Sequence, residues 1–327
     1  MTNQKHTVIA YNKITDRSGE DMKDILEQVA WAEEILTGLG YTVERIAFDL
    51  SEPGLLKRLQ EKDPAFVFNL VEAGRGEESL AYLAGALFPL LGLKYTGCSV
   101  DAILTTTNKV LSKIMMKRAG ITTPGWVHAD DCRDFVPGCK YIVKPVREDA
   151  SVGIYQSSVV LAHDLKQLLG TMADRERNEG FEFFAERYVE GREFDVMLLS
   201  GQDGAEALPP LELIFNGFQE NRLEPLFSYQ GKWGGNPLEY DNVELVVAED
   251  GELSETMRQI ARDCWNLFQL SGYGKVDFRV DESGQPHVLE INANPSFYGF
   301  SRYEKAGHLT MREVFQRIVT AALERKV

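Results

Sequence analysis

Residues 274–293 read GKVDFRVDESGQPHVLEINA, and this stretch is the most informative part of the sequence. Two expected strands, GKVDFRV and HVLEINA, flank a turn centred on Ser283-Gly284, a dipeptide that tolerates a tight hairpin turn. Side chains alternate along a strand, so a register symmetric about that turn predicts a polar and an apolar face. The polar face pairs Asp277 with Glu290 and Lys275 with Asn292. The apolar face comprises Val276, Phe278, Leu289 and Ile291.

The polar face of this hairpin is a candidate cation site. Asp277 and Glu290 repel one another unless something neutralises them. Together with Asn292 they form an oxygen ligand set that suits a magnesium ion holding nucleotide phosphates. The alternative is a hairpin whose polar face only meets water, and a slip or bulge of one residue would also separate the cluster. The pattern alone leaves both interpretations open.

Upstream, the first hundred residues alternate strand and helix patterns. Strands are expected at 6–11, 42–48 and 65–70. Helices are expected at 20–39, 53–62 and 77–91. Strands separated by helices of this length indicate an open parallel sheet covered on both faces.

From residue 105 onward the chain reads as helices mixed with β-branched strands. A helix is expected at 108–119, and further helices at 164–173, 253–270 and 311–326. Strands are expected within 141–146, 153–161, 181–189 and 193–199. The predicted fold class is therefore α/β plus α+β. The predicted domains are an N-terminal α/β domain (1–104), a small β-rich lobe (105–185) and a larger C-terminal lobe (186–327).

The composition disfavours two kinds of binding partner, nucleic acids and membranes. The 327 residues include 35 Lys and Arg against 50 Asp and Glu, a net charge of −15 that disfavours binding to nucleic acid or anionic membranes. The four cysteines and five histidines show no metal-finger spacing, and no apolar run is long enough to span a bilayer. We expect a cytoplasmic protein that acts on small molecules.

Two basic features could bind phosphate groups. In KPVREDASVG, residues 144–153, a strand delivers Lys144 and a small-residue turn follows with Ser151. Lys109 opens an expected helix, where phosphate binding could offset its unfavourable position near the helix dipole. The alternatives are a polar hairpin loop and an exposed surface lysine.

A third feature, AERYVEGREF at 185–194, could recognise a nucleoside. Glu186 and Tyr188 share one face of the expected strand, and Glu193 follows a glycine turn. Such a segment can offer backbone groups to a flat heterocycle and a carboxylate to ribose hydroxyls. The alternative is an edge strand with solvated acidic side chains.

In order and spacing, these motifs resemble the ATP-grasp superfamily, and within it the D-alanine–D-alanine ligases. The resemblance covers nearly the whole chain and includes the segment YQGKW at 229–233. It implies a two-lobed ATP-grasp fold after the N-terminal domain, with ATP between the lobes. It further implies a C–N ligase that uses ATP and Mg²⁺ (with Mn²⁺ as a possible substitute) to form an acyl phosphate, which an amine attacks to release ADP and phosphate.

The resemblance also implies roles for individual residues. Lys109, Lys144 and Lys232 match phosphate-binding lysines, and Ser151 matches the phosphate-loop serine. Glu186 and Val189 match the adenine-recognising strand, and Glu193 matches the ribose-binding carboxylate. Tyr188 is a further expected ATP-binding residue. Asp277, Glu290 and Asn292 match the magnesium ligands. Lys275, Ser151 and Lys232 are the expected catalytic residues, and Glu20, Trp233 and Ser301 are the expected substrate contacts.

The departures from the family concern the amino-acid-binding half. Lys275 stands where the D-alanine ligases place an arginine, and a lysine keeps the charge but loses the bidentate fork. The family's His-Gly run after the third strand is replaced by LVEAGRGE at 70–77, and Asp149-Ala150 replaces a usual Gly-Ser. These departures favour a ligase that acts on amino-acid-like substrates other than D-alanine. A true D-alanine–D-alanine ligase and a catalytically silent nucleotide-binding regulator remain as alternatives, and a homodimer is expected by analogy with the family.

Overall fold

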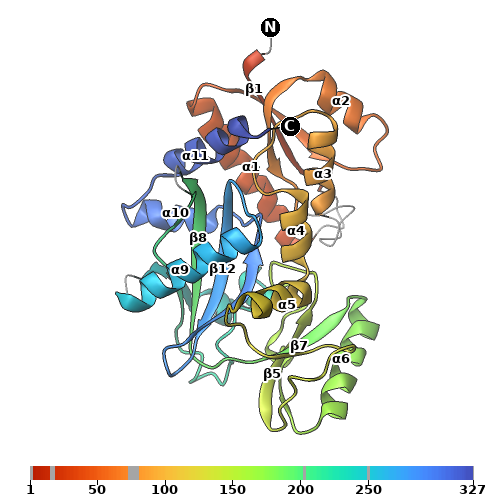
Figure 1. Cartoon of the computed structure of the whole chain (residues 1–327), viewed down its shortest axis with the longest axis vertical. Coiled ribbons are helices and arrows are strands. Elements are labelled where there is room, and N and C mark those ends of the chain that lie inside the picture. The colour runs from red at the N-terminus through yellow and green to blue at the C-terminus, as the bar shows by residue number, and fades with distance from the viewer. Residues whose placement is uncertain (1–2, 15–18, 73–80, 202–203, 249–250, 327) are drawn as a thin grey trace.

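The computed structural model describes residues 3–14, 19–72, 81–201, 204–248 and 251–326, and within these the side chains of 3, 4 and 20–23 are not described. The chain builds three sheets stacked along the long axis of the molecule (Figure 1). The predicted class of α/β plus α+β is confirmed, since one sheet is parallel and the other two are antiparallel.

The N-terminal sheet has the order β2-β1-β3 and is parallel throughout. Its strands are β1 (Asn3–Asn12), β2 (Thr42–Phe48) and β3 (Pro64–Leu70). The helices α1 (Glu20–Gly38) and α2 (Leu55–Glu61) connect these strands, and α3 (Tyr82–Leu90) follows β3. The first part of the helix expected at 77–91 lies outside the described residues.

One face of this sheet is covered by a helix from the far end of the chain. The helix α11 (Met311–Glu324) lies beside α1, as Figure 1 shows, and the ring of Phe315 stacks on Phe68 of β3 at 5.0 Å. Phe297 joins the same cluster, which continues into the C-terminal sheet through Met197 and Leu199. The N-terminal segment therefore shares a core with the C-terminal lobe.

The small lobe is an antiparallel sheet of order β4-β7-β5-β6. Its strands are β4 (Trp126–Val127), β5 (Cys139–Pro145), β6 (Val159–Ala162) and β7 (Phe183–Arg187). The helix α6 (Leu165–Glu179) covers one face, capped by Asp164, whose side chain accepts a bond from the N–H of Gln167. The expected strand at 153–161 is wrong in its first half, because Gln156–Ser158 form a short 3₁₀ turn.

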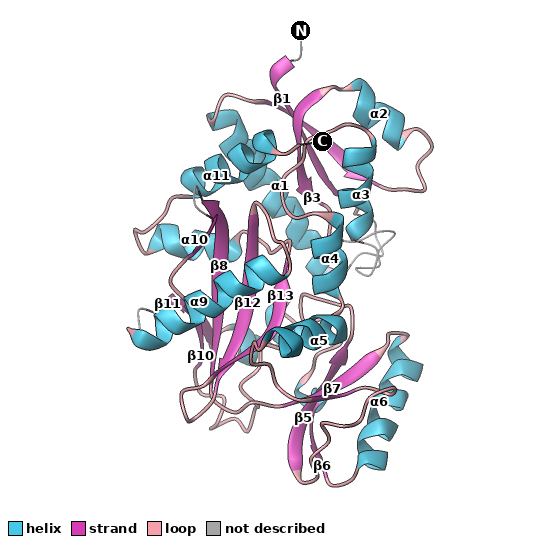
Figure 2. Ribbon diagram, in the orientation of Figure 1, coloured by secondary structure: helices cyan, strands magenta, loops and turns pink. Residues whose placement is uncertain are grey.

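The C-terminal sheet has the order β11-β10-β8-β12-β13, and β9 pairs with β8. Its strands are β8 (Arg192–Gly201), β9 (Gly204–Ala207), β10 (Leu211–Phe215), β11 (Val243–Val247), β12 (Tyr273–Val280) and β13 (Pro286–Asn292). The helix α9 (Glu252–Leu267) packs on one face, and α10 (Tyr298–Lys305) follows β13. Figure 2 shows this sheet between the other two.

The segments join through helices and strands. Two helices, α4 (Val100–Thr107) and α5 (Lys109–Ala119), lead from the N-terminal segment to the small lobe. The expected boundary at 104/105 falls within α4, and that at 185/186 falls within β7, so the exact boundaries stay predictions. Asn108 caps α5 by accepting a hydrogen bond from the Leu111 N–H at 3.0 Å, which fixes Lys109 at the first helical position.

Candidate active site

A cavity of about 1350 Å³ is lined by residues from all three segments. Every site residue that the sequence predicted lines this cavity, with the exception of Glu20. Glu20 is the first residue of α1, and its side chain lies outside the described part of the structure. The structure thus brings together side chains that are far apart in sequence: Lys109, Lys144, Ser151, Glu186, Tyr188, Val189, Glu193, Lys232, Trp233, Lys275, Asp277, Glu290, Asn292 and Ser301.

A row of carboxylates crosses the C-terminal sheet beneath this cavity. Asp277 of β12 lies opposite Glu290 of β13 on one side and opposite Asp195 of β8 on the other. Lys275 Nζ donates to Asp277 Oδ2 at 2.9 Å and to Asp195 Oδ2 at 3.3 Å. Burial alone would lower the pKa of Lys275, but Asp195 and Asp277 raise it above its ordinary value, so the lysine is held as a cation.

The predicted hairpin register holds at the end that carries the polar cluster. Lys275 pairs with Asn292 and Asp277 with Glu290, as the sequence predicted. Beyond Asp277 a bulge shifts the register, so that Phe278 lies opposite Val288. Leu289 was expected in the apolar face and instead lines the cavity, while Val288 takes the core position.

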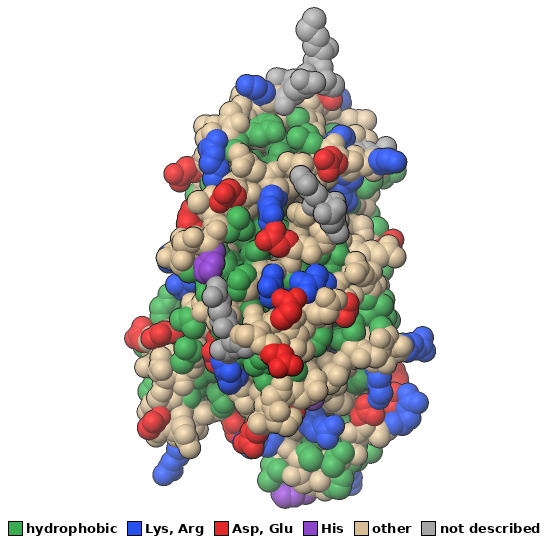
Figure 3. Space-filling model, turned by 60° about the vertical axis from the view of Figure 1, so that its left-hand side comes forward, with side chains coloured by type: hydrophobic (Ala, Val, Ile, Leu, Met, Phe, Trp, Pro, Cys, Tyr) green, Lys and Arg blue, Asp and Glu red, His purple; other side chains and the backbone are tan. Residues whose placement is uncertain are grey.

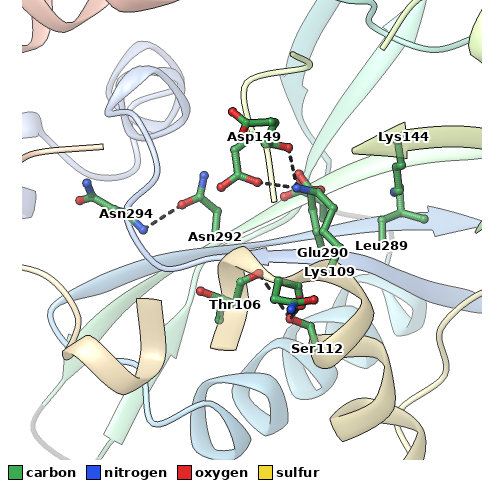
Figure 4. Close-up of polar contacts among 12 residues, drawn as sticks. Thr106, Lys109, Ser112, Lys144, Asp149, Leu289, Glu290, Asn292 and Asn294 are labelled. Atoms are coloured by element: carbon green, nitrogen blue, oxygen red, sulfur yellow. Dashed lines mark hydrogen bonds and ion pairs between the residues drawn. The ribbon is translucent and has the colours of Figure 1, made fainter. Parts of the chain in front are cut away.

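The carboxylates of Asp277 and Glu290 and the amide of Asn292 form an oxygen ligand set that suits a hard cation. In the described part of the structure, Asp277 Oδ1 is buried and has no hydrogen-bond partner, which is costly unless a cation contacts it. Asn292 Oδ1 accepts the Asn294 N–H at 2.8 Å, which orients the amide, as Figure 4 shows. Among the described residues no group of three or more His, Cys, Asp or Glu side chains has metal-site geometry, so the amide is needed to complete the set.

Lysines surround this cluster from separate elements. Lys109 Nζ donates to Asp149 Oδ1 and to the Glu148 carbonyl, both at 2.7 Å, and lies 3.5 Å from Glu290 Oε2 (Figure 4). Burial opposes the ionised form of Glu290, yet the charges of Lys109, Lys144, Lys275 and Lys232 lower its pKa to about 2. Four positive charges therefore act on one carboxylate.

Glu186 lies on the small-lobe side of the cavity between two lysines. Its carboxylate is 1% exposed, accepts a bond from Lys144 Nζ at 2.9 Å and pairs with Lys113 of α5. Burial lowers the pKa of Lys113 to about 8, which Glu186 partly opposes. Tyr188 and Val189, expected on the same strand as Glu186, follow the end of β7 instead.

The predicted ribose-binding carboxylate also has a cationic neighbour. Arg279 Nη2 lies 2.7 Å from Glu193 Oε2, and the guanidinium lies 5.2 Å from the centre of the Tyr188 ring. Burial raises the pKa of Glu193 above its ordinary value, and the positive charge of Arg279 opposes that shift. Arg279 contacts both Glu193 and Tyr188 and fixes them beside one another.

The loop expected to hold phosphate has strained backbone. Ala150 and Ser151 have φ angles of 52° and 63°, the left-handed region that side chains disfavour. Ser151 Oγ donates to the Phe227 carbonyl at 2.9 Å, and the Trp233 indole donates to the Ala150 carbonyl at 2.9 Å. These bonds tie the loop to residues on both sides of α7 (Tyr229–Lys232), the helix that carries Lys232.

Ser301 lies on α10 at another part of the cavity wall. Its hydroxyl donates to the Tyr298 carbonyl at 2.7 Å, one helical turn back. That bond leaves the oxygen lone pairs of Ser301 available as acceptors and uses its only proton.

Comparison with known proteins identifies the family. Residues 116–320 match the family model described as the D-ala D-ala ligase C-terminus, which is more than half of the chain. The chain is 31% identical to the D-alanine–D-alanine ligase of Laribacter hongkongensis over 294 residues, covering 86% of this chain and 87% of the relative. The chain belongs to the D-alanine–D-alanine ligase family. It is an ATP-dependent carboxylate–amine ligase of that family.

Two further comparisons show the range of this ligase family. The chain is 29% identical over 281 residues to the uncharacterized protein y4sG of Sinorhizobium fredii, covering 82% of this chain and 78% of that protein. The structure of the Bacillus anthracis D-alanine–D-alanine ligase complexed with ATP superposes with a TM-score of 0.71 at 19% identity, covering 98% and 97% of the two chains. The ATP-grasp fold predicted from sequence is confirmed.

Asp195, Lys113 and Asp149 are among the charged residues of this ligase site that the sequence did not predict. Asp195 lies two residues beyond Glu193 on the same strand, so the alternation of side chains could have found it. Lys113 lies four residues after Lys109 and thus on the same side of α5. Asp149 departs from the family pattern, and no signal in the sequence indicates that it pairs with Lys109.

Proposed function

We propose that this ligase activates the carboxylate of one amino-acid-like substrate with ATP and joins it to the amine of a second. The terminal phosphoryl group passes to a carboxylate oxygen and gives an acyl phosphate and ADP. The amine then attacks the acyl carbon, the bond to the phosphate oxygen breaks, and the products are an amide and phosphate. Attack on an acyl phosphate forms a tetrahedral intermediate whose negative charge the site must stabilise.

The observation that carries this proposal is the convergence of lysines on the carboxylate row. Lys109, Lys144 and Lys232 come from three elements, and each lowers the pKa of Glu290 together with Lys275. Such a concentration of positive charge, beside buried carboxylates, suits a polyphosphate with a divalent cation. A catalytically silent regulator would have no need to retain all of it.

In the proposed mechanism the protein mainly positions charge. Asp277, Glu290 and Asn292 would hold Mg²⁺, or Mn²⁺ in its place, which when bound neutralises phosphate oxygens. The three phosphate lysines orient the transferring group, and Ser151 belongs to the loop over the phosphates. Lys275, which Asp195 and Asp277 orient, supplies positive charge to the developing oxyanion.

The remaining residues of the proposal bind the nucleotide and the substrates. Glu186, Tyr188 and Val189 would recognise adenine, and Glu193 would bind the ribose hydroxyls. Glu20, Trp233 and Ser301 stay predictions as substrate contacts. The names of the relatives suggest an alternative in which D-alanine is both substrates. Two departures from the family support a different pair of substrates: Lys275, and Glu72 in the run that replaces the family's His-Gly.

A homodimer and a cytoplasmic location stay predictions. No described helix has the length and apolar character to cross a membrane.

The test is ADP release with ATP and Mg²⁺ against a panel of D- and L-amino acids, hydroxy acids and dipeptides. Asp277→Asn should lower kcat by roughly 100-fold or more, because the cation loses a charged ligand. Glu282→Gln is the matched control, since Glu282 is exposed in the turn of the same hairpin. Both variants should melt like the wild type. Equal turnover in Asp277→Asn and the wild type would disprove the metal-site assignment.

A further inference from the structure

Part of the cavity lining lies on α1, α10 and the start of α11, and we call this part the second arm. Its apolar side chains include Trp31, Ile35 and Met311. The proposed nucleotide and metal residues lie on other elements, so the arm is available to a substrate.

One side of the arm is basic. Along α10 the residues that line the cavity recur at helical spacing: Tyr298, Ser301, Arg302 and Lys305. Arg312 at the start of α11 adds a third cation to the wall, and it donates to the Gly38 carbonyl at 3.0 Å. Glu304 also lines the arm, and its carboxylate accepts the Met311 N–H at 3.2 Å.

Arg302 is the residue of this wall that is ready to bind an anion. Its guanidinium stacks on the Tyr298 ring, 4.4 Å from the centroid. Its Nε is buried and has no hydrogen-bond partner in the described part of the chain, and no described carboxylate forms an ion pair with it. A buried donor without a partner is costly, and a stacked guanidinium presents its N–H groups in the plane that suits a carboxylate.

Another part of the arm is acidic and belongs to α1. Asp24, Glu27 and Glu34 line the cavity at helical spacing, and Gln28 donates to Asp24 at 3.1 Å. Figure 3 shows basic and acidic side chains interspersed over one face of the molecule, without a broad patch of either sign. A substrate with separated positive and negative groups matches such walls better than a neutral one or a cation alone.

We infer that one substrate of the ligase is extended and anionic, with a carboxylate remote from the reacting group that Arg302 binds. This inference rests on the proposed function, and it names the substrate class of the same cavity. Apolar side chains along the arm accommodate the aliphatic part of such a molecule, and Lys305 adds charge at its end. A dicarboxylic amino acid and a short peptide with a free C-terminus share this chemistry.

Steady-state kinetics test this assignment. Aspartate and glutamate of both configurations form one arm of the panel, dipeptides the second, and alanine with the side-chain amides asparagine and glutamine the third. We expect turnover with a member of the first or second arm, and which arm responds distinguishes the two sources of the carboxylate. Turnover confined to the third arm would overturn the inference.

Variants of Arg302 test whether this residue causes the preference for an anionic substrate. Arg302→Gln should raise KM for the anionic substrate by roughly 10- to 100-fold and leave KM for ATP within a factor of two, because a charge-assisted hydrogen bond is lost. Arg302→Lys should restore part of the loss, since it keeps the charge without the fork. The matched control is Arg317→Gln, which removes a guanidinium of α11 that pairs with Glu206 outside the cavity. An unchanged KM in Arg302→Gln would overturn the inference.

Binding measured by calorimetry separates the two proposals. If no substrate pair releases ADP and ATP does not bind, the proposed function fails. If ATP binds, the anionic compound that binds the wild type in the presence of ATP should lose affinity for Arg302→Gln by the same roughly 10- to 100-fold. Equal affinity for both proteins, or no binding of any anionic compound, would overturn the assignment of Arg302.

Discussion

At the scale of single residues, ion pairs within the site position its lysines in the absence of ligand. Lys275 bridges Asp195 and Asp277, and Lys109 bridges Asp149 and Glu290. Each of these two lysines therefore contacts two carboxylates, which hold it beside the carboxylate row in the absence of ligand. Because burial makes an unpaired charge costly, these acids hold the lysines in place and reduce the rearrangement that phosphate binding would require.

Glu72 is a carboxyl group whose ionisation changes near neutral pH. It follows β3, and its N–H donates to Asn12 Oδ1 at 2.7 Å. Burial is the largest cause that raises its pKa to about 7, and Asp24 adds to it, while Lys232 and Gln28 oppose the shift. A carboxyl that keeps its proton longer in the folded state than in the unfolded state stabilises the fold less as pH rises from about 4.5 to 7.

Replacement of this carboxyl should remove that pH dependence. We expect Glu72→Gln and the wild type to be equally stable near pH 4.5 and the variant to be more stable at pH 8, by at most about 3 kcal/mol. Urea unfolding at several pH values measures the difference. Glu34→Gln, at an exposed position of α1, is the control and should follow the wild type at every pH. A Glu72→Gln profile parallel to that of the wild type would contradict the prediction.

At the scale of elements, the hairpin shows what alternation can and cannot predict. The period of two along β12 and β13 was enough to predict the pairs Asp277–Glu290 and Lys275–Asn292. The bulge near Leu289 was not predictable, because it depends on contacts from outside the hairpin. Lys113 of α5 donates to the Leu289 carbonyl at 3.2 Å and to Thr123 at 2.8 Å. A distant helix thus binds the carbonyl that the bulge exposes.

The same lysine joins two elements of the proposed nucleotide site. Lys113 contacts the β13 bulge and pairs with Glu186 of β7, and it is fully buried. Lys113→Met should lower the free energy of unfolding by about 3 kcal/mol or more, because Glu186 loses one of its two cations inside the protein. Denaturant unfolding at pH 7 measures this loss.

The matched control for this helix is Lys117→Met. Lys117 is exposed on α5 and pairs with Asp134 at 2.8 Å, so its removal should cost less than about 1 kcal/mol. The two variants remove the same charge from the same helix and differ in burial. Equal stabilities for Lys113→Met and Lys117→Met would show that the Lys113–Glu186 pair does not support the fold.

At the scale of the whole molecule, sequence patterns predicted the helices and strands better than the contacts between them. The strand at 42–48 was predicted to the residue, because its pattern is local. The packing of α11 on the N-terminal sheet was not predicted, since Phe315 and Phe68 are far apart in sequence. Arg302 was missed for the same reason, because only the folded cavity shows that its Nε lacks a partner in the described structure.

The arrangement of cores predicts how nucleotide binding affects stability. The N-terminal sheet and the C-terminal sheet share one apolar cluster, whereas the small lobe has its own, which includes Tyr141, Val143 and Phe183. The small lobe can therefore open without disrupting the shared core. Since the cavity is lined from both lobes, a nucleotide bound there stabilises the small lobe against this opening.

Hydrogen exchange followed by mass spectrometry measures this coupling. With Mg²⁺ and ATP at 100 times Kd, amides of β5 and β7 that exchange by opening of the lobe should exchange about 100-fold more slowly, which corresponds to about 2.7 kcal/mol. Amides of β1 and β3, which lie in the shared core, should change less, because they do not require the small lobe for protection. ATP with a chelator in place of Mg²⁺ should give a smaller effect if the carboxylate row binds the cation. Unchanged exchange in β5 and β7 while ATP is bound would mean that the nucleotide does not bridge the lobes.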